Sequence, residues 1–249
     1  MAPKAEEIVD IPFTKQMRKA TRDVHGISDA LINAKLGIAL SDNGVWAEGL
    51  LVFYDVFAWL EGALDRLGAS LVGELDIEGM RRRDAFEADL TFYLGADWQG
   101  THVPRPAVRR YLEHLEQLER EEPHLLMAYV YHLYMGLLSG GQVLRRKRQL
   151  VGRLLGRGES DEAGNAVTYY GQHKIGHLKR QLAAAMDHAA QLLDDVTRER
   201  VVEESKQVFL RNNEIVATVR GANEVLLRKL RNAVIVVVII VLLYWMLFR

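Results

Sequence analysis

Apolar residues recur every three or four positions along most of the chain, which is the spacing of amphipathic α-helices. No useful length of sequence alternates apolar and polar residues as a half-buried strand would. The sequence therefore predicts an all-α fold, with a single multi-helical domain followed by a separate apolar helix. The predicted helices cover about residues 13–31, 46–67, 86–93, 108–118, 123–150, 167–193 and 196–230.

The C-terminal segment carries no charged residue from Ala233 to Phe248. A buried core helix could have this length, but the segment is apolar on every face and is flanked by Arg228, Lys229 and Arg249. We therefore expect residues 228–249 to anchor the chain in a membrane and residues 1–227 to form a soluble domain. The first residues do not read as a secretory signal, so the tail is expected to sit in the endoplasmic reticulum membrane with the domain facing the cytosol.

Composition narrows the chemistry that the chain can carry out. Its 249 residues include 32 Lys or Arg and 33 Asp or Glu, for a formal net charge of −1. This balance argues against a nucleic-acid partner, and the basic run 145–148 is typical of a solvated helix face or of a patch that docks an acidic partner. Cysteine is absent, which excludes disulfides, iron–sulfur clusters and a cysteine nucleophile.

The first predicted helix carries a line of polar residues. Arg18, Arg22, His25 and Asp29 are spaced four, three and four positions apart, which places them on one face. One interpretation is a solvated charged face. The other is a haem site, in which His25 binds the iron, Asp29 accepts the other ring N–H, and the arginines reach the propionates. The helix alone leaves both interpretations open.

A glycine cluster interrupts the fifth predicted helix. Gly136, Gly140 and Gly141 lie within LYMGLLSGGQVL, and a mid-helix glycine costs about 1 kcal/mol relative to alanine. The cluster marks either a helix end or a bend, and the apolar pattern resumes at Val143, which favours a bend. A bent helix with bare backbone on one face would let a flat ligand lie against it, as a distal wall opposite His25.

Three other histidines are weaker candidates. His173 and His177 have the i, i+4 spacing of metal ligands, but no third ligand accompanies them, and a solvated helix face is the favoured interpretation. His132 lies one turn before Gly136 and could compete with His25 as a haem ligand on the distal side.

Several motifs together resemble one family. The sequence is similar to the heme oxygenases, in particular to the eukaryotic, membrane-anchored type, from about Arg18 to Val216. The motifs that carry the resemblance are LSGGQVL at Leu138–Leu144, KATRDVH at Lys19–His25, EADLTFYLG at Glu87–Gly95, EPHLLMAY at Glu122–Tyr129 and RVVEESKQVFLRN at Arg200–Asn212.

The resemblance implies an enzyme that opens haem oxidatively with O2 and reductant. The products are biliverdin, carbon monoxide and iron, and haem is both substrate and cofactor. Electrons would come from NADPH through NADPH–cytochrome P450 reductase, which is also tethered to the endoplasmic reticulum. Heme oxygenases place haem between a proximal helix and a kinked distal helix, so the same arrangement is expected here.

The resemblance also assigns roles to individual residues. His25 would be the proximal iron ligand, and the distal wall would be formed by Gly136, Ser139, Gly140 and Gly141, with Leu137 between them. The propionates would be held by Arg18, Arg22, Tyr131 and either Lys179 or Arg180. Phe209 and Asn212 would line the far end of the pocket.

Two positions depart from the family pattern. Leu137 stands where the family has an aspartate that orders water above the metal, and a leucine can neither donate nor accept a hydrogen bond. The motif LAAAMDH places Ala183 or Ala184 where an arginine would bind a propionate. We therefore expect slow turnover and a mixture of biliverdin isomers. The alternatives are a haem-binding or haem-sensing protein with little turnover, or a tail-anchored helical interaction protein.

Overall fold

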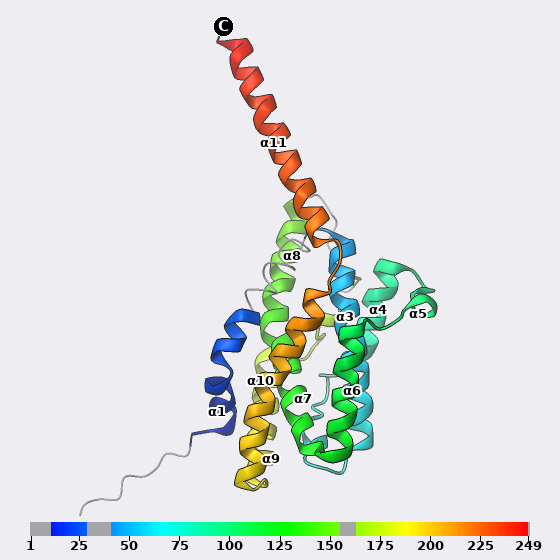
Figure 1. Cartoon of the computed structure of the whole chain (residues 1–249), viewed down its shortest axis with the longest axis vertical. Helices are drawn as coiled ribbons and strands as arrows, with labels where there is room; N and C mark the ends of the chain where they lie inside the picture. The colour runs from blue at the N-terminus through cyan, green and yellow to red at the C-terminus, as the bar shows by residue number, and fades with distance from the viewer. Residues whose placement is uncertain (1–10, 29–40, 155–162, 249) are drawn as a thin grey trace, which may run out of the picture.

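The computed structural model describes residues 11–28, 41–154 and 163–248, and within these ranges all regular structure is helical (Figure 1). The α-helices are α1 (Phe13–Ala20), α3 (Asn43–Arg66), α4 (Arg83–Leu94), α5 (Trp98–Thr101), α6 (Pro106–Glu121), α7 (Leu126–Gly136), α8 (Gln142–Leu154), α9 (Ile175–Gln191), α10 (Asp195–Ala217) and α11 (Ala222–Leu247). Short 3-10 helices cover η1 (Gly73–Leu75), η2 (Pro123–Leu125) and η4 (Ala166–Thr168), and η3 (Leu137–Gly141) is a π-helix. The predicted all-α fold is confirmed.

Local sequence signals set several of the helix starts. Asp42 caps α3, because its side chain accepts hydrogen bonds from the backbone N–H groups of Gly44 and Val45. Asp194 caps α10 in the same way through Thr197, at 2.9 Å. Pro106 occupies the first turn of α6, where its missing N–H costs no hydrogen bond.

Two of the predicted helices are broken in the structure. The pattern over 167–193 contains η4, then a non-helical stretch, and α9 starts only at Ile175. The pattern over 196–230 contains α10 and α11, separated at Thr218–Gly221. Gly221 has a φ of 79°, a left-handed conformation that favours glycine and ends the helical path.

The core forms where α3 packs against α4 and α6, and where α7 packs against α10. Phe57 of α3 lies between Phe86 and Tyr134, with ring centroids 5.1 and 5.3 Å away. The Tyr134 hydroxyl donates a hydrogen bond to Glu61 at 2.8 Å, and Glu61 also accepts from the backbone N–H of Arg82, so this buried carboxylate is satisfied. These contacts fix α7, whose C-terminal end runs into the glycine segment.

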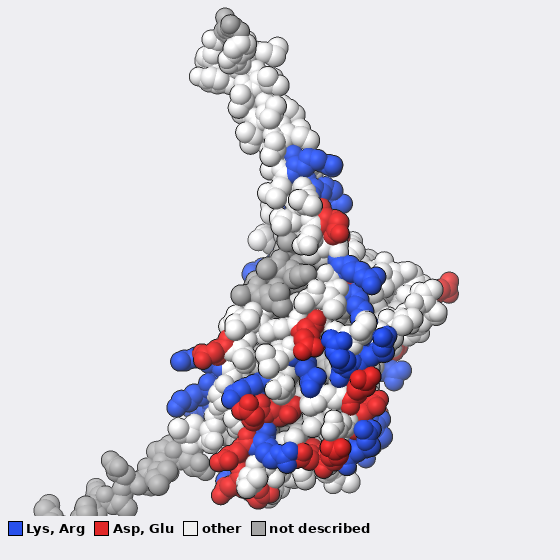
Figure 2. All heavy atoms as spheres, viewed as in Figure 1, with Lys and Arg blue, Asp and Glu red and all other residues white. Residues whose placement is uncertain are grey.

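Helix α11 extends away from the rest of the molecule (Figure 1). Its 26 residues have a mean hydropathy of 2.4 in their most apolar window, and none of that window is buried. Figure 2 shows that the outer part of α11 carries no charged side chains and that Lys and Arg side chains gather where the helix leaves the rest of the molecule. The exposure argues against a buried core helix, and the length and composition suit a membrane span.

Candidate functional site

The N-terminal helix presents the predicted polar line to the outside. Phe13, Met17 and Thr21 face the core, whereas Arg18 and His25 are exposed. The helical path continues past Thr21, since the N–H of His25 donates to the Thr21 carbonyl at 2.8 Å. Arg22 is also exposed and pairs only loosely with Asp23, at 3.8 Å. Asp29 lies outside the described residues.

The rings of His25 and His132 both lie against the ring of Phe209. The His25 ring lies 5.2 Å from the ring of Phe209 on α10, between centroids. The ring of His132 on α7 lies 5.0 Å from the same phenyl ring. Burial, and the proximity of His25, lower the pKa of His132 to about 3, so its ring is neutral at physiological pH. His25 therefore lies beside the turn of α7 that precedes Gly136.

The distal segment bends as the glycine cluster predicted, and the bend is the π-helix at Leu137–Gly141. Such π-bulges often occur at functional sites. Gly136 and Gly140 are exposed, and no atom lies within 4 Å of the position that a Cβ would take at either residue. Packing within the described chain thus gives no reason for these glycines, although each weakens a helix by about 1 kcal/mol relative to alanine.

Leu137 turns toward the protein rather than standing free in the bend. A Cβ built on Gly141 would contact Leu137 Cδ2 at 3.6 Å and Thr168 Cγ2 at 3.5 Å. Leu137 is partly buried and packs against the core, whereas Ser139 beside it is exposed. The leucine therefore fills space on the inner side of the π-helix.

A polar cluster surrounds Tyr131, one of the residues predicted to bind a propionate. Asp187 of α9 accepts hydrogen bonds from the backbone N–H of Thr14, at 2.8 Å, and from its hydroxyl, at 3.2 Å. Tyr131 is buried nearby; burial and the charge of Asp187 raise its pKa, while the charge of Arg18 acts in the opposite direction. The structure thus brings Tyr131 and Arg18 together and adds Asp187, which no sequence motif had indicated.

The other predicted cation position is less defined. Lys179 is half-buried on α9 and Arg180 is exposed, with its guanidinium near Gly176. Ala183 and Ala184 follow on the same helix, so no cation stands at the position where the family has its second arginine.

Phe209 and Asn212 differ in their surroundings. Phe209 contacts both histidine rings, as described above. Asn212 is held between α6 and α10, where its side-chain oxygen accepts a hydrogen bond from the Tyr111 hydroxyl at 3.1 Å. Its amide oxygen is therefore engaged in packing the helices together.

Two arginines of the basic run stack on aromatic rings, whereas the other basic and histidine candidates are exposed. Arg145 stacks over Tyr169 at 4.9 Å, and Arg148 stacks over Trp46 at 4.7 Å, which leaves Arg146 and Lys147 as the exposed part of the basic run. No group of three or more potential metal ligands occurs among the described residues, so His173 and His177 gain no third ligand there.

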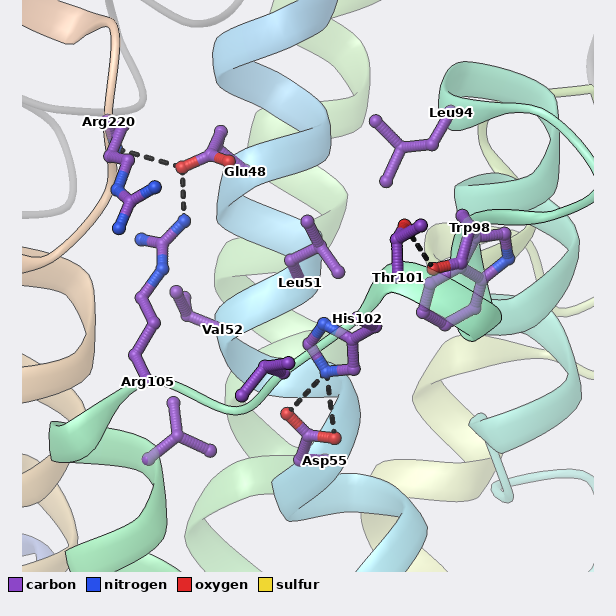
Figure 3. A pocket seen from close by; sticks show the side chains of 12 residues that line it. Glu48, Leu51, Val52, Asp55, Leu94, Trp98, Thr101, His102, Arg105 and Arg220 are labelled. Atoms are coloured by element: carbon purple, nitrogen blue, oxygen red, sulfur yellow. Dashed lines mark hydrogen bonds and ion pairs between the residues drawn. The ribbon is translucent and has the colours of Figure 1, made fainter.

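A separate cavity of about 370 Å³ lies between α3, α5 and the segment before α6 (Figure 3). At one side, Arg105 pairs with Glu48, and at the other, His102 Nε2 lies 2.9 Å from Asp55 Oδ2. Burial raises the pKa of Asp55, although His102 partly offsets this. None of the site residues predicted from the sequence lines this cavity, and its only hydroxyl, on Thr101, donates to the Trp98 carbonyl at 3.1 Å.

The residues around the bend suit a haem group. Gly136 and Gly140 leave bare backbone that no other part of the described chain covers, and the imidazole of His25 is exposed close by. His132 keeps a buried Nε2 without a hydrogen-bond partner among the described residues, as expected where a ligand completes the site. Arg18 and Tyr131 supply donors for an anionic edge.

The chain belongs to the heme oxygenase family, whose model matches residues 11–218. Heme oxygenase from Rhodella violacea is 27% identical over 214 residues, covering 84% of this chain and 87% of the relative. Human heme oxygenase 1 is 30% identical over 206 residues, covering 80% of this chain and 69% of that protein.

Solved structures agree with this assignment. The crystal structure of heme oxygenase 2 from Chlamydomonas reinhardtii, determined without heme, has a TM-score of 0.76 and 30% identity, and the match covers 84% of this chain and 98% of that one. Heme oxygenase-1 from Synechocystis, in complex with heme, shares the fold with a TM-score of 0.78 at 21% identity, over 90% of this chain and 100% of that one.

Proposed function

We propose that this chain, an enzyme of the heme oxygenase type, cleaves haem to biliverdin, carbon monoxide and iron with O2 and electrons from NADPH. The observation that carries the proposal is the placement of an exposed histidine, His25, beside the α7 turn that leads into a bare glycine bend. Glycine at Gly136 and Gly140 has no packing role in the described chain, so a ligand lying on the backbone explains both positions.

Each part of the site has a role in this proposal. His25 holds the iron from one side, and the π-helix forms the opposite wall, with Ser139, Gly140 and Gly141 in it. Bound haem supplies the iron that activates O2, and it is also the molecule that is cleaved. Arg18 and Tyr131 orient haem through a propionate, with Arg22 and either Lys179 or Arg180 as further cations.

Leu137 favours a second candidate function. Its side chain packs inward on Gly141 and offers no hydrogen bond, so water in the distal wall lacks the carboxylate that the family pattern provides. The loss of an arginine at Ala183 or Ala184 leaves haem less firmly clamped against in-plane rotation. Slow turnover with mixed isomers follows from both features, and a haem sensor with almost no turnover is the limiting case.

Helix α11 supports a membrane location for the reaction. Its exposed apolar length suits a tail anchor, and we infer an endoplasmic reticulum location with the domain in the cytosol. NADPH–cytochrome P450 reductase is then the natural electron donor, since both proteins share one surface. Arg146 and Lys147 are exposed near the bend and could contact an acidic donor.

The test is haem addition to the full-length chain in detergent, followed by reductase and NADPH. The proposed enzyme gives a Soret band with haem and a biliverdin spectrum on reduction. A Soret band without pigment would favour the sensor, and the absence of a Soret shift would favour a helical interaction protein. His25→Ala is expected to abolish the histidine-ligated spectrum, with recovery by added imidazole.

A further inference from the structure

The cavity beside α3 lies apart from the proposed haem site (Figure 3). Its volume of about 370 Å³ is at the lower end of the range typical of small-molecule sites, which is about 300–1,000 Å³. None of the residues assigned to haem binding lines it. The cavity is therefore a possible ligand site that the proposed function does not use.

One end of the cavity holds an arginine whose charged group is not engaged elsewhere. Glu48 and Arg105 form an ion pair there, and the Arg105 guanidinium also donates to the Thr218 carbonyl. Arg220 is exposed; its backbone N–H donates to Glu48 at 3.1 Å, whereas its guanidinium has no hydrogen bond or ion pair with any described residue. Figure 3 shows both guanidinium groups beside the Glu48 carboxylate.

The other end presents one ring nitrogen of a histidine. His102 Nε2 lies 2.9 and 3.1 Å from the two carboxylate oxygens of Asp55. Because a carboxylate only accepts hydrogen bonds, the neutral ring carries its proton on Nε2, and Nδ1 is an acceptor. Nδ1 has no partner among the described residues, and Figure 3 shows it on the side of the ring away from Asp55 and toward Leu51. The cavity therefore ends in an unused acceptor.

The walls between the two ends are apolar. They include the side chains of Leu51, Val52, Trp98 and Val108. Glu48 and Asp55 both belong to α3 and lie seven positions apart, so the two ends are separated by about 10 Å along the helix axis. An aromatic ring placed beside Trp98 gains edge-to-face or offset contacts. The walls thus suit a flat apolar body that carries a polar group at each end.

The charges that line the cavity favour an anionic ligand. Its two acidic side chains are engaged, Glu48 by Arg105 and Asp55 by His102. The guanidinium of Arg220 is the charged group of the lining that has no such partner among the described residues. A carboxylate matches a guanidinium in charge and in hydrogen-bond geometry, whereas a cation would find both acids occupied.

We propose that this cavity binds a small aromatic hydroxy acid. The carboxylate pairs with the guanidinium of Arg220. The ring lies against Leu51 and Trp98, and the hydroxyl at the far end donates a hydrogen bond to Nδ1 of His102. The site is separate from the haem site, and the inference does not rest on haem cleavage.

The test uses the full-length chain in detergent with para-hydroxyphenylpropionate, its amide, which lacks the charge, and phenylpropionate, which lacks the hydroxyl. Titration calorimetry is expected to show the tightest binding for the hydroxy acid and an affinity about threefold to tenfold lower for each of the other two. NMR of the methyl-labelled chain should show contacts from the probe ring to Val52 and Val108. Both side chains line the cavity and are otherwise buried, so a probe bound elsewhere on the surface does not reach them.

Variants assign the two ends. Arg220→Gln removes the cation and keeps the backbone hydrogen bond to Glu48, and Arg120→Gln, at an exposed arginine of α6, is the matched control. We expect Arg220→Gln to weaken the hydroxy acid at least threefold and to leave the amide unchanged, while Arg120→Gln matches the parent. Asp55→Leu combined with His102→Phe removes the acceptor without leaving an unpaired buried carboxylate. In that double variant the hydroxy acid and phenylpropionate should bind equally.

Several results would overturn the inference. One is the absence of saturable binding of the hydroxy acid at roughly 10 mM. Others are equal affinities of the parent for the acid and the amide, or an unchanged affinity for the acid in Arg220→Gln. If the double variant does not fold, the parent's preference for the hydroxy acid over phenylpropionate decides the role of His102. Soret titration should give the same haem affinity in Arg220→Gln and the parent, and a parent that bound no haem would overturn the proposed function alone.

Discussion

Replacing Gly140 by alanine should change stability and haem binding in opposite directions. Among the described residues, no atom beyond the neighbouring backbone of the helix itself lies within 4 Å of the position that the new methyl group would take, and Gly140 does not have a positive φ. The methyl group therefore meets no clash in the free chain, while the unfolded chain loses conformational freedom. We expect Gly140→Ala to stabilise the domain by about 0.5–1 kcal/mol, which corresponds to a rise in Tm of roughly 2–4 °C for 1 kcal/mol in a domain of this size.

The affinity for haem should decrease in Gly140→Ala. If the porphyrin lies directly on the backbone of the bend, the new methyl group stands between them and forces the ligand away from the wall. Lost contact along the distal wall should weaken haem binding at least tenfold, which is about 1.4 kcal/mol. A purely structural role for the glycine would leave the affinity unchanged.

Gly152→Ala is the matched control. Gly152 lies on α8, it also has no atom within 4 Å of its Cβ position, and it is not one of the predicted site residues. Thermal unfolding followed by circular dichroism, without haem, should show a gain in both variants, whereas Soret titration should show weaker binding only in Gly140→Ala. Equal haem affinity in Gly140→Ala and the parent would refute the assignment of Gly140 to the distal wall.

The remaining predictions concern Asp89, Leu137 in the bend, the alanines where an arginine would bind a propionate, and the C-terminal segment. Burial raises the pKa of Asp89 to about 6, whereas an aspartate in the unfolded chain has a pKa of about 3.9. Between these pH values the folded chain therefore binds more protons than the unfolded chain. The contribution of Asp89 to the free energy of unfolding falls as pH rises from about 4 to about 6, by at most about 3 kcal/mol. Urea unfolding at about pH 4 and about pH 7 should show a smaller loss in Asp89→Asn than in the parent, and equal losses would contradict the assignment. Leu137→Asp should speed pigment formation if water enters the distal wall, as absorbance after adding reductase and NADPH would show. Ala183→Arg or Ala184→Arg should narrow the mixture of biliverdin isomers separated by chromatography, whereas a single isomer from the parent would mean that another feature orients haem. A fluorescent protein fused to Leu227–Arg249 should reach the endoplasmic reticulum, and cytosolic fluorescence would contradict the anchor.

The helices that the sequence predicted well are those with a continuous buried stripe. Helix α3 follows the predicted 46–67 closely, because Val56, Phe57 and Leu60 keep the 3.6-residue period against neighbouring helices. The hydrophobic period of 3.6 residues does not reveal a break in a helix when buried residues keep the same spacing on both sides of the break. At the junction of α10 and α11, Val219 and Ala222 are both buried, so the pattern reads through Gly221.

The structure adds what holds that break together. Arg105, more than a hundred residues earlier in the chain, donates to the Thr218 carbonyl and pairs with Glu48. Such a contact depends on the packing of distant helices and leaves no local signal. The turn at Thr218–Gly221 thus depends on the conformation of Gly221, which the sequence indicates, and on the guanidinium of Arg105, which the sequence does not indicate.

The site divides in the same way. The polar face with Arg18 and His25 follows from helical spacing that continues past the end of α1 at Ala20, and the bend follows from its glycines. Grouping His25 with His132 and Phe209 requires three helices to be placed in space, so the sequence offered His132 only as a competing ligand on the distal side. Asn212 was predicted to line the pocket, but its side-chain oxygen accepts a hydrogen bond from Tyr111 and so helps to pack α6 against α10.

The geometry of the bend is maintained from its inner side. Asp89 accepts hydrogen bonds from the backbone N–H groups of Ala166 and Val167, at 2.8 and 3.0 Å, and so holds η4 in place. Thr168 of η4 then packs on Gly141, and its carbonyl accepts a hydrogen bond from the Gln142 side chain at 2.8 Å. These contacts brace one side of the π-helix, and no described residue packs over the side with Gly136 and Gly140.

Leu137 belongs to this inner support as well as to the proposed distal wall. Its side chain and the methyl group of Thr168 both lie against Gly141, so the leucine contributes apolar packing at the point where the bend is braced. An aspartate in the same rotamer would place a carboxylate beside a methyl group, which is costly without a hydrogen-bond partner. Faster turnover in Leu137→Asp therefore requires the new side chain to turn toward the open wall, and it should come with a measurable loss of stability.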